Sequence, residues 1–561
     1  MKDFDDIRNH CDQLVEWYSM RDNMLEEMRQ MFHMEWSDQP TGDWIKETMS
    51  PTAFNAAIGA VRLLTSTEPQ WSVPFDEADL EAQKSSEKLE RAARAMWNAS
   101  GRIGLRPVHY DVVMSAILFG EVVGTVTKTA DLVEYAKAAK TVGGVARMER
   151  IVRETPYIFT IHNPMTSYPD YDRFGLRGLL TRKETTWGEV LDAWGDAAET
   201  AIGTGAETWD RLKRVNINDL YDWECRCVWL DETNDPIYSD EHGLSFLPVV
   251  AQITEGSTMF DLPEQQRFPL LYSVWKSGLW KRENLSLTVI YSLIFGIGSN
   301  HLLQQETDDL ESPVVIDRSI PGGVLKVPKG ERLSALMEKV IDPAQWQGLD
   351  KAQRLNEEST ISKQALGAPP QKQMAFSAIS LLTQSGRLPL MGAKQIGGQA
   401  IANLMIAAFD WWREDGDKAT LYNSGLKTEL AREDIPERVV IECNLEPDLP
   451  TDKMNMANIA QSLIGSGTTS KRWARENILS IGQSDQMDKE IWMEKRIALE
   501  VESRMMMLQQ QMKQQAQMAQ QPQGQNVNAP VTPYPEGGID EGQPMSAPMM
   551  TPEMMSDANN S

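Results

Sequence analysis

The chain has 561 residues, of which 41% are apolar and 24% are charged, an ordinary composition for a globular protein with roughly two to four folded regions. Its 81 acidic residues outnumber its 55 lysines and arginines, so the formal net charge is −26. A surface of that sign repels phosphate, and this excludes a basic module that binds DNA by releasing counterions. Any contact with DNA must be weak or local.

The four cysteines, at positions 11, 225, 227 and 443, are too few for a disulfide framework in a chain of this length and favour a reducing compartment. Cys225 and Cys227 lie in an alternating pattern, so a strand would place both thiols on one face. Free cysteine at such a position usually acts as a small buried apolar residue. A metal site is disfavoured because no second pair of cysteines or histidines stands nearby to complete tetrahedral ligation.

Two segments bear on targeting. The first residues, Met1 to Asp6, carry charge where a secretory signal peptide would be apolar, so secretion is not expected. The segment from Leu285 to Gly298 has fourteen mostly apolar residues, fewer than the about 20 that span a bilayer. We expect it to form a helix buried against neighbouring helices, and we expect no membrane anchor.

The first half of the chain mixes helical and strand-like segments. Apolar residues return every three or four positions over residues 5–34, which predicts an amphipathic helix. Ser50 and Pro51 supply an N-cap and a first-turn proline for a second helix that runs to Leu64. A third helix is predicted at residues 78–99, after an extended segment at 71–74. Strands are predicted at residues 121–129, 157–162, 225–230 and 247–254.

Helices dominate from Leu270 onward. A long helix is predicted to run from Leu270 to about Ser299, followed by short strands at residues 313–316 and 324–327 around a Pro-Gly-Gly turn. Asp342 and Pro343 then favour the start of a polar helix over residues 344–366, ending at Gly367. The chain between the two helices is therefore expected to be a small β-containing insertion.

The last third is expected to alternate between loops and helices. Two prolines make residues 368–373 a loop, and an apolar helix from Met374 to Trp412 is kinked at residues 386–392. A strand is predicted at 439–443, and helices follow Asp452. A pattern of alternating three- and four-residue spacing, typical of a coiled-coil seam, is followed by Ala498, Val501, Met505, Leu508 and Met512. The seam holds under three heptads, so a helix hairpin within one subunit and self-association both stay open.

Motifs of catalysis are absent from the sequence. It contains no phosphate-binding G-x-x-x-x-G-K-[ST], no H-E-x-x-H, no G-x-S-x-G and no C-x-x-C, and its six histidines are dispersed. We therefore predict no catalytic, cofactor-binding or metal-binding residues, and no enzyme. Tryptophans are numerous at seventeen, and those at 275, 280, 411 and 412 lie in apolar helical segments. Core or subunit-interface packing is the expected role of these four.

Several segments, in their order and spacing, resemble the portal (head-to-tail connector) family of tailed phages, most closely the portals of short-tailed phages. They are Ser50–Asn55, Pro69–Pro74, Ile161–Pro169, Leu270–Gly278 and the run from Ser359–Gly367 to Leu388. The resemblance implies an α+β, predominantly α fold with wing, stem, clip and crown regions. It also implies assembly into a closed ring, usually of twelve subunits.

The resemblance assigns each part of the chain to a region of that fold. The regions are a mixed α/β wing at 1–261, a stem helix at 262–299, a β-containing clip at 300–342, a return stem helix at 343–366, a tunnel loop at 367–374, a kinked wing helix and strand at 375–452, crown helices at 453–518 and a disordered Met/Gln/Pro-rich tail at 519–561. By position, the tunnel-loop residues facing DNA would be Gln371, Lys372 and Gln373. The stem-helix interface residues would be Leu285, Val289, Ile290, Leu293 and Ile297.

The function implied is a conduit for DNA during packaging into the capsid and ejection from it. The partners would be sister copies, the terminase large subunit, a head-tail adaptor, capsid and scaffolding proteins, and double-stranded DNA that passes non-specifically. The location would be the portal vertex of the virion, and the host cytoplasm during assembly. An acidic wall suits a conduit because it holds no phosphate strongly. Two alternatives stay open: a helical scaffold or minor capsid protein without a channel, and a membrane-docking ejection protein that uses Leu285–Gly298.

Overall fold

The structure is a computed structural model, and it describes most of the chain outside several gaps. Described are residues 4–36, 47–75, 80–103, 106–131, 149–203, 209–233, 235–254, 256, 260, 262–299, 303–307, 324–328, 343–361, 387–416, 418–423, 426–445, 450–467, 474 and 491–507. The chain divides into two compact units, Met1–Ser484 and Asp485–Ser561. Helix and strand are interspersed and helix is the larger part, which confirms the α+β class.

The N-terminal segment forms two helices, α1 (Phe4–Trp17) and α2 (Ser19–His33), where one was predicted. The break falls at Tyr18, whose side chain is buried and whose hydroxyl donates to the carbonyl oxygen of Pro169 at 2.8 Å. That contact lies far away in sequence, so the local apolar period could not reveal the break.

Three further helices follow in the first unit. They are α3 (Thr52–Leu64), α4 (Leu80–Ile103) and α5 (Val108–Phe119). The predicted α3 is confirmed to within a residue at its start, and α4 extends four residues beyond its predicted end. Helix α5 was not predicted, and it ends at Gly120, which has a positive φ of 67°.

Two antiparallel sheets make up most of the strand content. In the first, β2 (Glu121–Lys128) lies between β3 (Tyr157–His162) and β9 (Val249–Ile253). The second is a five-stranded meander in chain order, comprising β4 (Ser167–Asp172), β5 (Gly175–Thr186), β6 (Arg214–Asp222), β7 (Cys225–Leu230) and β8 (Tyr238–Glu241). The four predicted strands, β2, β3, β7 and β9, are confirmed. Cys225 and Cys227 are both buried on the same face of β7, as expected.

Short elements connect these sheets. The 3-10 turn η1 (Pro164–Thr166) precedes β4, the helices α8 (Trp187–Trp194) and α9 (Asp196–Ile202) separate β5 from β6, and η3 (Pro263–Gln265) follows β9.

The segment predicted as one helix from Leu270 to Ser299 is interrupted. It contains α10 (Tyr272–Lys276) and α11 (Leu279–Ser299), separated at Gly278, whose φ of 66° is left-handed and cannot continue a right-handed helix. Strands β10 (Leu303–Thr307) and β11 (Val324–Pro328) pair in parallel, and β11 confirms the predicted strand at 324–327. The strand predicted at 313–316 lies outside the described residues.

Helix α12 (Pro343–Glu358) begins where predicted but ends before Leu366. Ser359 to Ile361 leave the helical path, and the hydroxyl of Ser273 donates to the carbonyl oxygen of Ser359 at 2.8 Å. After the described chain resumes at Arg387, η4 (Leu388–Leu390) leads into α14 (Met391–Asp415).

The main core is built around α14. This helix packs on α5, β2, β9 and β14 (Glu442–Asn444), and it buries Leu404, Met405 and Phe409 completely. A Cβ atom at Gly398 would overlap the carbonyl oxygen of Cys443, so glycine permits this close approach of helix and strand. Trp280, Trp411 and Trp412 are buried in the same core, as predicted.

The remaining elements lie after α14. They are the hairpin β12 (Ala419–Asn423) and β13 (Leu426–Leu430), η5 (Arg432–Asp434), β14 and α15 (Pro450–Gly465). Strand β14 begins three residues later than predicted, and it pairs antiparallel with β1 (Gln70–Ser72), which confirms its return to the mixed half. In the second unit, residues 491–507 are helical, and the seam residues Ala498, Val501 and Met505 are exposed. Leu508 and Met512 lie outside the described residues.

Candidate functional site

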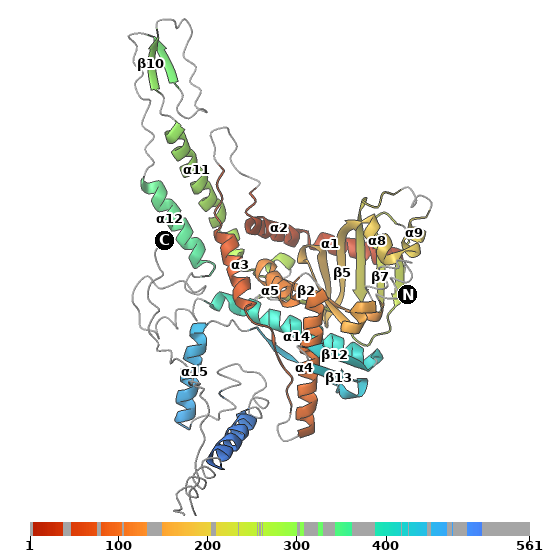
Figure 1. Ribbon diagram of the computed structural model, residues 1–561. Helices are drawn as coiled ribbons and strands as arrows, with labels where there is room; N and C mark the ends of the chain where they lie inside the picture. Colours follow the sequence, from red (N-terminus) through yellow and green to blue (C-terminus); the bar gives the residue numbers. More distant parts are fainter. Residues whose placement is uncertain are drawn as a thin grey trace, which may run out of the picture. The chain divides into compact units, whose positions relative to one another are not determined.

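The helix pair α11 and α12 contains the predicted interface residues. The two helices lie side by side, and β10 and β11 continue the chain beyond the end of α11 (Figure 1). The pair joins the rest of the first unit through contacts of α12 with α3 and of α11 with α10. Its side chains are distributed unusually for a helix of a globular protein.

Four polar side chains of α11 are buried beside Trp280 and Ile290. Glu283, Asn284, Thr288 and Ser292 are all at most 3% exposed. One carboxylate oxygen of Glu283 accepts hydrogen bonds from the hydroxyls of Ser50 at 2.6 Å and Thr52 at 3.1 Å, which flank the start of α3. The sequence indicated Ser50 as an N-cap, but its hydroxyl is used chiefly by Glu283.

The same polar contact extends to α12 and to the segment before α3. The side-chain amide of Asn356 donates to Glu283, and the backbone N–H of Ser50 donates to Asn284 Oδ1 at 2.8 Å. The hydroxyl of Thr288 donates to the carbonyl oxygen of Thr48 at 3.2 Å. Hydrogen bonds to neutral donors therefore hold the base of α11 in one register, and directional contacts of this kind specify position more than they add stability.

Four apolar side chains of α11 are exposed, on more than one side of the helix. Leu285, Val289, Tyr291 and Ile294 are 45%, 39%, 47% and 41% exposed. Leu285 and Val289 are one helical turn apart and share a face. Alongside Trp280 and Ile290, α11 buries four polar side chains, and it exposes these four apolar ones in addition to Lys281 and Arg282, which departs from the usual distribution of a surface helix. These four side chains form the exposed stripes of α11.

The five predicted interface residues are placed differently. Leu285 and Val289 lie in the exposed stripes, and Leu293 is half-buried. Ile290 is 1% exposed and packs inside its own chain, so it does not belong to the exposed stripes. Ile297 lies in α11, but its side chain is outside the described part, as are the predicted tunnel-loop residues Gln371, Lys372 and Gln373.

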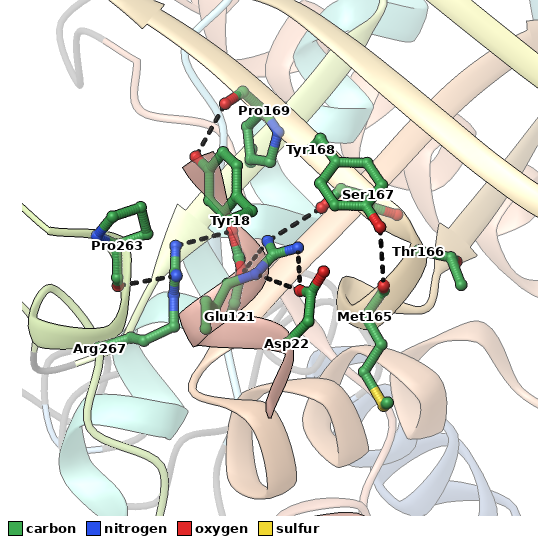
Figure 2. Close-up of polar contacts among 12 residues, drawn as sticks. Tyr18, Asp22, Glu121, Met165, Thr166, Ser167, Tyr168, Pro169, Pro263 and Arg267 are labelled. Carbon is green, nitrogen blue, oxygen red and sulfur yellow. Dashed lines mark hydrogen bonds and ion pairs between the residues drawn. The ribbon is translucent and has the colours of Figure 1, made fainter. Parts of the chain in front are cut away.

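A buried ion cluster lies at the junction of four segments (Figure 2). Glu121, at the start of β2, pairs with Arg21 of α2 and with Arg267 after η3, each at 3.3 Å, and all three side chains are fully buried. Arg21 also donates to the carbonyl oxygen of Ser167 at 2.9 Å, and Arg267 to that of Pro263 at 2.8 Å. The cluster thereby joins the N-terminal helices, both sheets and the segment that leads to α11.

Tyrosine rings surround these charges. The Arg21 guanidinium lies 4.1 Å from the Tyr18 ring centroid, and burial raises the pKa of Tyr18 to about 12. Burial also raises the pKa of Asp22, although the Arg21 guanidinium at 2.7 Å opposes that shift. Sequence reasoning missed this cluster. Its one local signal is Arg21, which lies on the apolar face of its helix between Tyr18 and Leu25.

Two histidines lie in the interior of the protein. Burial lowers the pKa of His162 to about 4 and also lowers the pKa of His109. The ring of His162 is 2.9 Å from the hydroxyl of Thr125.

Within the part of the chain that the structure describes, no three His, Cys, Asp or Glu side chains converge as a metal site would require. Of the helices described, none is both long and apolar enough to cross a membrane.

No protein-family model matches the sequence, and no curated protein matches it. The side chains of the exposed stripes and the order of the elements are therefore the observations that bear on function.

Proposed function

We propose that the chain is a subunit of a viral portal, the ring through which DNA is packaged into a capsid and later ejected. On this proposal, α11 and α12 are the stem, β10 and β11 belong to the clip, and the two sheets belong to the wing. The ring would dock the terminase motor and, later, the tail adaptors. It is a structural assembly rather than an enzyme.

The observation that carries the proposal is the set of apolar side chains that α11 exposes while it buries four polar ones. Leu285, Val289, Tyr291 and Ile294 would be shielded from water if copies of the helix stood beside one another, and Glu283 would meanwhile keep its contacts within the subunit. Burying such side chains contributes about 25 cal/mol per Å² of apolar surface. Exposed apolar patches of this kind mark interaction surfaces.

The order of elements supports the same proposal. A helix, a small β-containing segment and a returning helix beside the first occur in sequence, each within the bounds that the resemblance assigns to stem, clip and return stem. In a closed ring every subunit presents two different faces to its neighbours. Exposed apolar side chains on more than one side of α11 suit such an arrangement.

A second candidate rests on the same observation, since the exposed stripes could also contact lipid. Sedimentation velocity of the purified full chain, with and without neutral phosphatidylcholine vesicles, separates the two. The portal proposal predicts a discrete ring species that does not float with vesicles. Monomers that float with vesicles would favour membrane docking, and helical oligomers without a hole would favour a scaffold.

A further inference from the structure

Exposed aromatic and basic side chains lie together at the β4–β5 and β6–β7 turns of the five-stranded sheet. Phe174, at the β4–β5 turn, is 81% exposed, more than any other large apolar side chain in the described part of the chain. Trp223, at the β6–β7 turn, is 49% exposed, and its indole N–H donates to the carbonyl oxygen of Leu176 at 3.1 Å. Arg173 and Arg177 flank Phe174. We call these four residues (Arg173, Phe174, Arg177 and Trp223) the hairpin tip.

The hairpin tip is held in one conformation by its own turn. Asp172 and Gly175 are paired across the hairpin, so only Arg173 and Phe174 form the loop. The carboxylate of Asp172 accepts from the backbone N–H of Phe174 at 2.7 Å, and Gly175 takes a φ of 127° that favours glycine. An exposed aromatic side chain on so short a loop is pre-organised for binding.

The chemistry of the hairpin tip suits a protein partner with acidic and aromatic side chains. The Arg173 guanidinium lies 4.5 Å from the Phe174 ring centroid, and among the described residues it has no carboxylate partner. Arg177 is 3.7 Å from Asp170, a loose contact. Phe, Trp and Arg are enriched at the centres of protein interfaces. Carboxylates on a partner would form ion pairs with Arg173 and Arg177.

One cavity of the same chain has the complementary chemistry. It lies between α2, α10 and the start of α11, has a volume of about 290 Å³, and contains one cation, Lys281. Its acidic and aromatic lining residues are Glu26, Glu27, Trp36, Trp275 and Trp280. We call these five residues the acidic–aromatic pocket. The Trp275 indole N–H donates to Glu27 Oε2 at 2.7 Å, which fixes the carboxylate beside the aromatic wall.

Three other cavities fit the hairpin tip less well. The cavity beside Phe268 is lined by no carboxylate, and the one beside Asp410 includes Leu176 from the hairpin itself. The cavity between α14 and β14 is lined by one carboxylate, Glu442, together with Lys394 and four amides, and by no aromatic side chain. Of the four, only the acidic–aromatic pocket combines two carboxylates with aromatic walls.

Its carboxylates can accept a new cation. Glu26 pairs with Arg29 at 2.7 Å and Glu27 lies 3.7 Å from Lys281, but these side chains are between 35% and 47% exposed. Exposed ion pairs contribute little and exchange partners readily. An arginine that arrives with an aromatic ring can therefore add a cation–π contact with tryptophan to its ion pair.

We propose that the hairpin tip of one copy of this chain docks in the acidic–aromatic pocket of a second copy. The two surfaces share no residue and come from different elements, so each copy keeps one of them available after it has used the other. Such a head-to-tail contact can propagate until a ring closes. The inference rests on the proposed function and adds a contact separate from the exposed stripes of α11.

A charge exchange tests the proposed contact, because both surfaces belong to the same chain. Arg173→Glu alone and Glu27→Arg alone should each raise the concentration at which half of the subunits are in rings by about tenfold, as loss of one interface ion pair does. The chain that carries both changes should return to within about threefold of wild type. Phe174→Ala should weaken assembly without changing charge. Mass photometry across a dilution series measures all four.

Arg214→Glu is the matched control. Arg214 is exposed and begins β6 of the same sheet, where it pairs with Thr186 at the end of β5 that lies away from the β4–β5 turn. This variant should assemble as wild type does. If wild-type rings form and both single reversals assemble equally well, the docking inference is overturned and the portal proposal stands. If both singles are weak and the double change restores nothing, tip and pocket do not meet. If wild type itself forms no rings, the portal proposal fails first.

Discussion

Glu121 is the residue on which the joint between the two sheets depends. It is fully buried between two guanidiniums that no other carboxylate among the described residues pairs with, apart from Asp22 beside Arg21. A buried charge cluster is tolerable only while its charges balance. Removing the central anion leaves two buried cations, of which only Arg21 keeps a carboxylate partner, Asp22.

Glu121→Gln should therefore lower the free energy of unfolding by about 3 kcal/mol. Urea titration followed by tryptophan fluorescence measures it. Glu184→Gln is the control, since Glu184 pairs with Arg214 where both side chains are more than half exposed. That change should cost less than about 1 kcal/mol. Equal effects from the two substitutions would show that the cluster contributes no more than a surface pair.

His162 gives the fold a dependence on pH. Its pKa is lowered to about 4 in the folded state, against about 6.5 in an unfolded chain, because burial disfavours the imidazolium. The unfolded state therefore binds a proton first, and stability is lost as pH falls from about 6.5 to about 4, by up to about 3 kcal/mol. His162→Gln should unfold with a shallower dependence over that window. Parallel curves for both proteins, from urea titrations at each pH, would contradict this.

Lys372 tests the loop assignment, which depends on the resemblance because the residue lies outside the described part. Lys372→Ala should leave rings intact and lower the rate or length of DNA packaging, because a basic side chain would help to centre DNA in an otherwise acidic channel. A packaging assay with purified motor and empty heads measures it. Wild-type packaging by the variant would mean that DNA is guided elsewhere.

Helix α11 is the element on which the portal proposal depends most. Its apolar run was visible in the sequence, but which side chains face outward depends on the contacts of Glu283 with Ser50 and Thr52. Those contacts cross more than 230 positions. These contacts of Glu283 fix the rotation of α11 about its axis, and this rotation determines which apolar side chains are exposed.

Leu285→Glu combined with Val289→Glu should abolish ring assembly and leave the thermal midpoint of the subunit within a few degrees of wild type, because both side chains are already exposed. Lys84→Glu on α4 changes the net charge by the same amount and should assemble normally. Sedimentation velocity and circular dichroism give the two readouts. Rings formed by the double variant would remove α11 from the interface.

The elements show which parts of a fold can be read from local pattern. Strands β3 and β7 were predicted at their observed bounds because apolar and β-branched residues alternate there. Three other features were not predicted, because a distant partner determines each of them. Pro169 contacts Tyr18 at the break between α1 and α2, Ser273 contacts the chain where α12 ends, and β1 pairs with the shifted β14. The break at Gly278 had a local signal, the glycine itself. It was not predicted because the apolar residues on both sides favoured one continuous helix.

The five-stranded sheet was missed except for β7. Strands such as β4 and β6 carry aspartates and asparagines that local propensity assigns to loops. In the structure these side chains pair across strands, as Arg226 does with Asp219 at 2.7 Å. The hairpin tip and the buried ion cluster both depend on this sheet, so neither could be predicted.

At the scale of the whole molecule, the acidic composition and the candidate contacts agree with one arrangement. A chain with a net charge of −26 holds DNA only loosely, which suits a conduit. Copies of this chain repel one another because each carries the same net negative charge. Self-association therefore requires local attraction, which the apolar stripes and a few arginines can supply. The exposed helix at residues 491–507 leaves self-association and an internal hairpin both open for the second unit.

Negative-stain electron microscopy of the purified full-length chain tests the central claim most directly. If copies shield the stripes of α11 by standing around a central hole, annular particles of uniform diameter should be seen, and their end-on class averages should show a stain-filled centre. Monomers alone at every protein and salt concentration tried, or oligomers without a hole, would contradict the portal proposal.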